Sequence, residues 1–137
     1  MKISVKVDYA CRVMAEMCRL HGSGTLAQIE HLARTEAVPA NFLAQILGKL
    51  RTHGLITSRR GNQGGYILAR PPEEISLYDI LMAVEGQCLH LSGNFHGRSG
   101  RRLKQVWGEI SGTLVEKTKS YTLNQLSTKN PSEMYYI

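Results

Sequence analysis

The sequence is poor in cysteine, with only Cys11, Cys18 and Cys88 in 137 residues. An odd, widely spaced set does not make a disulfide framework, which excludes the class of small secreted proteins held together by disulfides. No apolar run approaches the roughly 20 residues that a membrane-spanning helix needs. The first residues also lack the continuous apolar segment of a secretory signal. These absences predict a cytoplasmic protein.

The sequence also lacks the motifs of common enzyme classes. It contains no HExxH, no GxGxxG and no P-loop, and its Ser, His, Asp and Cys residues form no recognisable catalytic set. The five histidines do not have the spacing of a structural zinc site. We therefore expect neither an enzyme nor a bound cofactor.

What the sequence does contain is an uneven distribution of basic charge. The formal net charge is +6, from 17 Lys and Arg against 11 Asp and Glu. Residues 1–70 hold ten basic and four acidic side chains, whereas residues 71–137 hold seven of each. The whole excess lies in the first half, which indicates a module facing a polyanion, joined to a module with another task. A basic surface that is merely solvated is the alternative interpretation.

Apolar residues at helical spacing predict three helices in the first half of the chain. The first spans about residues 8–20, with Asp8 as its N-cap. The second starts with a capping box, in which Thr25 is the N-cap and Gln28 the N3 residue, and it stops near Val38.

The third helix begins at Pro39 and ends at Gly54. Its inward face is apolar and carries Phe42, Ile46, Leu47 and Leu50. Its opposite face presents small or amide-bearing residues, namely Asn41, Ala44, Gln45, Gly48 and Thr52. Because that face has no acid, it differs from a merely solvated helix surface, which more often carries Glu and Lys.

A β-hairpin is predicted after the third helix. Residues 55–58 and 66–68 are its strands, and the basic, glycine-rich segment 59–65 supplies the positive φ angles that its tip needs. Two consecutive prolines then close this first module.

The second half predicts further helices around an irregular loop. Residues 76–86 form a capped helix, residues 87–100 an irregular loop, and residues 101–118 the longest amphipathic helix, while Thr122 caps a last short helix. The apolar stripe of the long helix consists of Leu103, Val106, Trp107, Ile110 and Leu114. One small domain cannot cover so long a stripe, so we expect it to be a dimer interface.

Two short helices joined by a tight turn and followed by a basic hairpin predict a winged helix-turn-helix. The expected fold is mostly α-helical with a small β-hairpin wing. Residues 1–72 would form the DNA-binding module, and residues 73–137 the sensing loop and dimerisation helices of the same compact chain. The alternative is a small α+β fold whose helix pair only packs.

The expected DNA contacts follow from the size of the major groove, which admits one helix. Asn41 and Gln45 are four residues apart on the third helix, and an amide side chain can bond adenine through two hydrogen bonds. The remaining candidates, for phosphates, guanine or the minor groove, are Thr25, Gln28, Pro39, Lys49, Arg51, Arg59, Arg60 and Gln63.

The chain resembles the IscR/NsrR/CymR family of bacterial winged-helix transcription regulators. The resemblance covers nearly the whole chain, and its most specific part is the Arg-Gly-x-x-Gly-Gly-Tyr wing. The matching stretches are Met1–Ser4, Tyr9-Ala10, Leu50–Ile56, Arg60–Leu68, Asp79-Ile80 and Tyr121–Leu123. The resemblance implies a homodimer that pairs through helix 101–118, each winged module binding half of a dyad-symmetric operator.

Many members of that family hold an iron–sulfur cluster through three cysteines in the loop before the long helix. Here that loop contains Cys88 alone, with His90 and His96 as the other soft ligands. A conventional cluster normally takes four ligands, mostly cysteines, so we expect no cluster. The resemblance is greatest to the cluster-free CymR-like branch, whose members are controlled by a partner protein or by thiol oxidation.

The sequence therefore predicts a DNA-binding transcriptional regulator, expected to act as a repressor. Its candidate sensing residues are Cys88, His90 and His96, and a regulatory protein or a small effector is a candidate partner. One alternative is a metal- or iron–sulfur-dependent redox or nitric-oxide sensor that uses the same loop residues. Another is a protein-interaction module that controls a metabolic enzyme without binding DNA.

Overall fold

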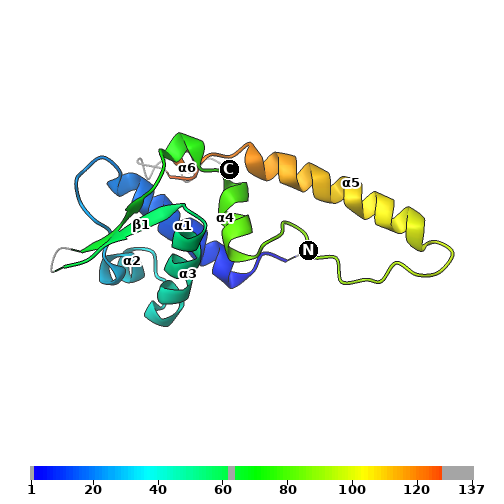
Figure 1. The fold of residues 1–137 in the computed structure, drawn as a ribbon, viewed down its shortest axis with the longest axis horizontal. Helices are drawn as coiled ribbons and strands as arrows, with labels where there is room; N and C mark the ends of the chain where they lie inside the picture. The colour runs from blue at the N-terminus through cyan, green and yellow to red at the C-terminus, as the bar shows by residue number, and fades with distance from the viewer. Residues whose placement is uncertain (1, 62–63, 128–137) are drawn as a thin grey trace.

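The computed structural model describes residues 2–61 and 64–127 and shows a mostly helical protein with one two-stranded antiparallel hairpin (Figure 1). A 3-10 turn, η1, follows the hairpin. The elements, in chain order, are α1 (Val5–Leu20), α2 (Ile29–Thr35), α3 (Ala40–Thr52), β1 (Ile56–Arg59), β2 (Gly65–Leu68), η1 (Pro72–Glu74), α4 (Leu77–Val84), α5 (Gly100–Lys119) and α6 (Leu123–Leu126). The predicted fold class, a winged helix-turn-helix with a long additional helix, is confirmed.

The first helix begins one turn earlier than predicted. Ser4 is the N-cap, and its hydroxyl oxygen accepts a hydrogen bond from the Val7 N–H at 3.2 Å. Asp8 therefore lies inside the first turn, where its carboxylate pairs with Arg12 at 2.8 Å. The assignment of Asp8 as N-cap is wrong because the helix starts four residues earlier, where Ser4 already caps the free Val7 N–H.

The predicted capping box at Thr25 is also wrong. Gln28 is the N-cap of α2, and the backbone of Ala27 exchanges two hydrogen bonds of 2.9 Å with Tyr66 of β2. The segment before α2 is therefore extended, because strand-like pairing with the hairpin satisfies its backbone groups. The helix also ends at Thr35 rather than near Val38, and Ala37 in the following turn has a positive φ of 55°.

Elsewhere the predicted boundaries agree closely with the structure. Pro39 is the N-cap of α3, and Gly54 follows its C-cap with a φ of +76°, a conformation that glycine adopts without strain. Ser76 with Asp79, and Thr122 with Gln125, form the capping boxes of α4 and α6.

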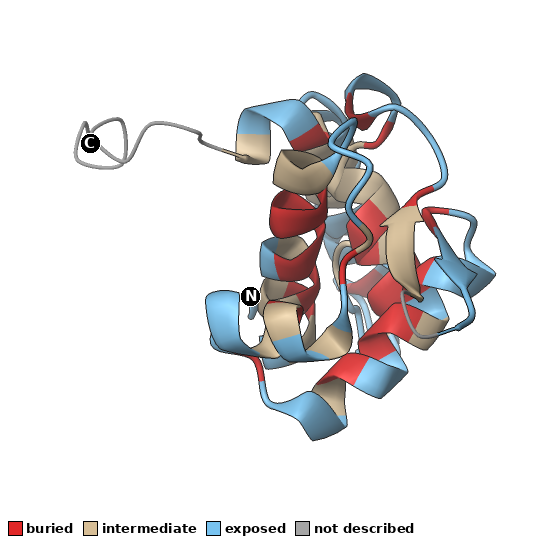
Figure 2. Ribbon diagram, turned by 90° about the vertical axis from the view of Figure 1, so that its left-hand side faces the viewer, coloured by how far each residue is buried: buried red, intermediate tan, exposed pale blue. Residues whose placement is uncertain are grey.

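The hydrophobic core lies between α1, α3 and α4 and extends to α6 and the hairpin. Buried residues line the facing sides of these helices in Figure 2. Figure 1 shows α5 extending away from this body, with the irregular loop 87–99 running from α4 to its far end. Within residues 2–61 and 64–127, no helix is both long and apolar enough to cross a membrane.

Candidate nucleic-acid interface

The outward face of α3 is available for contact with a ligand. Asn41, Ala44 and Gln45 are exposed, whereas the opposite face of the helix is fixed in the core by Leu43, Ile46, Leu47 and Leu50. Leu43 is fully buried, although the sequence pattern did not assign it to the inward face. Phe42, which the pattern did assign there, is half-buried. Its ring packs edge-on against that of Tyr9, with 5.7 Å between the ring centroids. The core therefore holds α3 rigidly with its two amide side chains facing outward.

A basic groove lies between α2 and the hairpin. Its polar and charged lining comprises Thr25, Gln28, His31, Arg34, Arg59 and Arg60, and it continues as a shallower groove past Glu30 toward Gly61 and Gly64 near the hairpin tip. Three arginines thus line one depression, and guanidinium groups pair well with phosphates. We call this depression the α2–wing groove.

Sequence reasoning missed Arg34 in this groove. Gln28, His31 and Arg34 recur every three residues, which is the spacing of neighbours on one helix face. Once the start of α2 is placed at Gln28, that spacing is the signal that could have identified Arg34.

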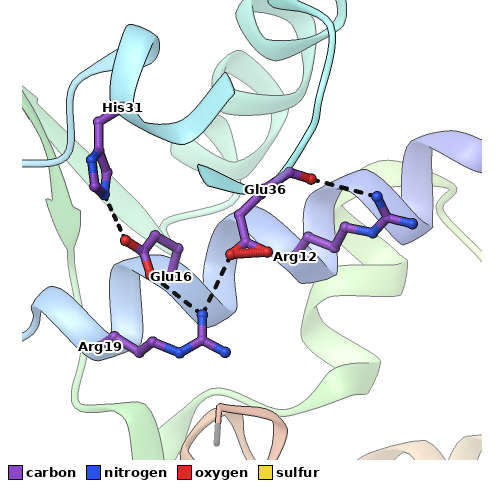
Figure 3. A network of polar contacts seen from close by, with 5 residues as sticks. All are labelled: Arg12, Glu16, Arg19, His31 and Glu36. Carbon is purple, nitrogen blue, oxygen red and sulfur yellow. Dashed lines mark hydrogen bonds and ion pairs between the residues drawn. The ribbon is translucent and has the colours of Figure 1, made fainter. Parts of the chain in front are cut away.

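A polar network fixes α2 against α1 (Figure 3). The carboxylate of Glu16 is buried and accepts hydrogen bonds from His31 Nε2 at 2.6 Å and from Arg19 at 3.3 Å. Arg19 also pairs with Glu36 at 3.4 Å, at the C-cap of α2. Burial raises the pKa of the Glu36 carboxyl above its ordinary value, although the Arg19 charge opposes that shift.

The other residues predicted to contact DNA differ in whether they face solvent or bond within the protein. Arg51 is exposed in the last turn of α3, whereas the Lys49 ammonium donates a hydrogen bond to the Val84 carbonyl at the end of α4, at 3.2 Å. Lys49 therefore faces α4 in this structure. Pro39 is exposed at the start of α3, and Gln63 lies outside the described residues.

The predicted dimerisation stripe on α5 is largely open to solvent. Leu103 and Trp107 are 50% and 40% exposed, and Val106, Ile110 and Leu114 are half-buried. Large apolar side chains exposed in a row on one helix indicate a surface for a partner.

The loop between α4 and α5 brings together only part of the predicted sensing set. Cys88 is half-buried, with its sulfur 3.8 Å from Thr118 Oγ1, and it lines a cavity of about 360 Å³ with His90, Leu114 and Lys2. His96 is exposed and does not line this cavity. Among the described residues, no three His, Cys, Asp or Glu side chains form a group that could hold a metal ion.

The profile of the Rrf2 family, whose description is "Iron-dependent Transcriptional regulator", matches residues 3–129. The chain belongs to the Rrf2 family. The iron named in that description has no fitting ligand set among the described residues, because Cys88 has no second cysteine beside it and His96 lies away from its cavity.

Two relatives from this family illustrate the match in sequence. CymR of Bacillus subtilis, an HTH-type transcriptional regulator, is 31% identical, and the alignment covers 100% of both chains. Rv1287 of Mycobacterium tuberculosis, named provisionally as an HTH-type transcriptional regulator, is 43% identical over 86 residues, or 63% of this chain. The chain spans about half the length of that relative, 53%. These relatives are regulators of transcription and not enzymes.

Solved structures of this Rrf2 protein's relatives have the same fold. The structure of CymR, the global cysteine regulator of B. subtilis, has a TM-score of 0.80 at 29% identity and covers 95% of this chain and 98% of CymR. That of T. potens IscR has a TM-score of 0.74 at 28% identity and covers 98% and 97% of the two chains.

Proposed function

We propose that this Rrf2-family protein binds duplex DNA as a homodimer, at a dyad-symmetric operator, and thereby represses transcription in the cytoplasm. The observation that carries the proposal is the acid-free outward face of α3 beside the α2–wing groove, into which three arginines converge. A helix that presents amides to a major groove, flanked by cations for the phosphates, is the arrangement that sequence-specific binding needs.

The two parts of this surface would have different tasks. Asn41 and Gln45 lie on the exposed face of α3, where amide groups can read base edges. Arg34, Arg59 and Arg60 lie in the α2–wing groove, where guanidinium groups would neutralise phosphates or enter a narrow minor groove. Lys49 is bonded to Val84 and would have to leave that carbonyl to contact a phosphate.

The dimer would form through the apolar stripe of α5. Contact between two identical stripes would bury this apolar surface on both copies. Such a dimer sets the distance between two α3 helices, and that distance must match one helical turn of DNA or a multiple of it. The protein would work without a conventional iron–sulfur cluster, because its loop offers one cysteine.

The test is selection of bound fragments from a pool of random duplexes, followed by fluorescence anisotropy at several salt concentrations. We expect an inverted-repeat sequence to be enriched, and the logarithm of its affinity to fall steeply with the logarithm of salt concentration. No enrichment, or binding that ignores salt, would contradict the proposal. Iron and sulfide in protein purified without air should be far below stoichiometric amounts.

A further inference from the structure

A cavity distinct from the sensing loop lies beneath the segment that joins α1 to α2. It measures about 290 Å³. Its apolar wall comprises Met17, Leu20, Ile67 and Leu68, of which Met17 is 2% and Leu68 8% exposed. Gly22 and Gly24 border the cavity with φ angles of +82° and +78°. The space thus lies between the end of α1, a glycine-containing loop and the hairpin.

The lining of this cavity contains one guanidinium group, that of Arg59. The basic side chains that line it are His21 and Arg59, and none of the described residues in its lining is Asp or Glu. Arg59, Leu20 and Thr25 also line the α2–wing groove, so the apolar space adjoins the groove that contains Arg34 and Arg60. An apolar pocket with a guanidinium in its lining complements a molecule that has an apolar body and one anionic end.

We infer that this cavity is a binding site for a small amphipathic carboxylate, whose apolar chain fills the space and whose charged end pairs with Arg59. At about 30 Å³ for each water-sized group, the space accommodates roughly ten non-hydrogen atoms. The apolar chain gains by leaving water, and the carboxylate gains a charge-assisted hydrogen bond.

Occupation of this cavity would also oppose DNA binding, an effect that rests on the proposed function. A carboxylate on Arg59 competes directly with a DNA phosphate for the same guanidinium. The apolar chain would lie next to the two hydrogen bonds between Ala27 and Tyr66, which connect the start of α2 to the hairpin. The ligand would therefore bind more tightly to the free protein than to the DNA complex, as a releasing effector must.

The test uses octanoate, octanol and acetate as probes in isothermal titration calorimetry with the full chain. Octanoate should bind one per chain. Octanol lacks the charge and should bind at least roughly tenfold more weakly, whereas acetate lacks the apolar chain and should bind at least roughly a hundredfold more weakly. Equal affinity for octanoate and octanol would overturn the role of Arg59, and equal affinity for octanoate and acetate would overturn the role of the cavity.

Two substitutions that fill the cavity with a larger side chain test whether it is the binding site. Ile67→Trp and Leu20→Phe should each lower octanoate affinity by roughly tenfold or more, since a filled cavity leaves no room for the chain. DNA affinity measured without octanoate should stay unchanged in Ile67→Trp, because Ile67 does not line the α2–wing groove. Val5→Trp is the matched control, because Val5 is 58% exposed and lies outside the cavity lining. Unchanged octanoate binding in both filled variants would overturn the assignment.

The two proposals fail separately. If octanoate binds to the wild type and not to the filled variants while no duplex is bound, the cavity assignment stands and the DNA-binding proposal fails. If duplex is bound and octanoate is not, the cavity assignment fails alone. If both bind, octanoate should lower the DNA affinity of the wild type and not that of Ile67→Trp.

Discussion

At the scale of single residues, Gln45 is the side chain on which sequence selectivity should depend most. It is exposed at the centre of the acid-free face of α3, where its amide can make two hydrogen bonds to an adenine. Gln45→Ala should cost about 1–3 kcal/mol of binding free energy at one operator position and remove the preference there. The measurement is anisotropy on the selected duplex and on single-base variants of it.

Arg59→Gln is the control for Gln45. Arg59 lies in the α2–wing groove, so its loss should weaken binding to all sequences alike and reduce the salt slope by about one. If Gln45→Ala instead weakened selected and random duplexes equally, α3 would contact the phosphates and not the bases.

Cys11 provides a residue-scale prediction about reactivity. Burial, and secondarily the negative charge of Asp8, raise the pKa of the Cys11 thiol to about 11. Because only the thiolate reacts, alkylation of Cys11 by iodoacetamide at pH 8 should be at least roughly tenfold slower than that of an exposed model cysteine peptide. Its rate should keep rising with pH until the pH approaches about 11.

Peptide mass spectrometry at a series of pH values measures this rate. A Cys11 rate that levels off near pH 9 would contradict the raised pKa. Slow reaction at neutral pH would also remove Cys11 from the candidates for a redox switch, and would leave Cys18 and Cys88 to be compared.

At the scale of elements, the buried Glu16 determines how firmly α2 is attached to α1. Glu16→Ala removes the acceptor of both His31 and Arg19, and should lower the free energy of unfolding by about 1–3 kcal/mol. The lower part of that range is expected, since the side chains of Arg19 and His31 are 33% and 38% exposed and water partly replaces the lost partner.

The matched control is Asp8→Ala on the same helix. It breaks an ion pair whose two side chains are 44% and 48% exposed, so it should cost at most about 0.5 kcal/mol. Urea unfolding followed by circular dichroism compares the two variants. Equal losses would show that the network contributes no more to stability than a surface pair does.

The start of α2 shows where sequence patterns suffice and where they do not. Thr25 with Gln28, Ser76 with Asp79 and Thr122 with Gln125 all fit the capping-box pattern, and the last two form it. At Thr25 the neighbouring Ala27 instead pairs with Tyr66, almost forty residues later. A local pattern contains no information about such a distant partner, and it therefore could not predict the extended segment.

The candidate site is likewise divided between residues placed by a local pattern and residues placed by distant contacts. Asn41 and Gln45 follow from helical periodicity alone, because the apolar residues of α3 define its buried face. The convergence of Arg34 with Arg59 and Arg60 depends on how the hairpin packs beside α2, which no spacing along the chain reports. The contact of Lys49 with Val84 likewise depends on the position of α4.

At the scale of the whole molecule, α5 extends from the core (Figure 1), and its apolar stripe is largely open to solvent. Ile110 lies near the middle of this stripe, so Ile110→Asp would place a charge in the proposed dimer interface. Because burying an unpaired carboxylate is unfavourable, we expect a folded monomer that has lost operator binding. Light scattering after size exclusion, at micromolar protein concentration, measures the mass.

The control on the same helix is Gln105→Asp. Gln105 is exposed, and helical geometry places it on the side of α5 opposite Ile110, so the same charge should leave the dimer intact. Circular dichroism should show that both variants keep their helices. A dimeric Ile110→Asp protein would mean that the two copies meet through another surface. In that case the distance between the two α3 helices would no longer be set by α5, and the half-site spacing found by selection would have to be explained by that other surface.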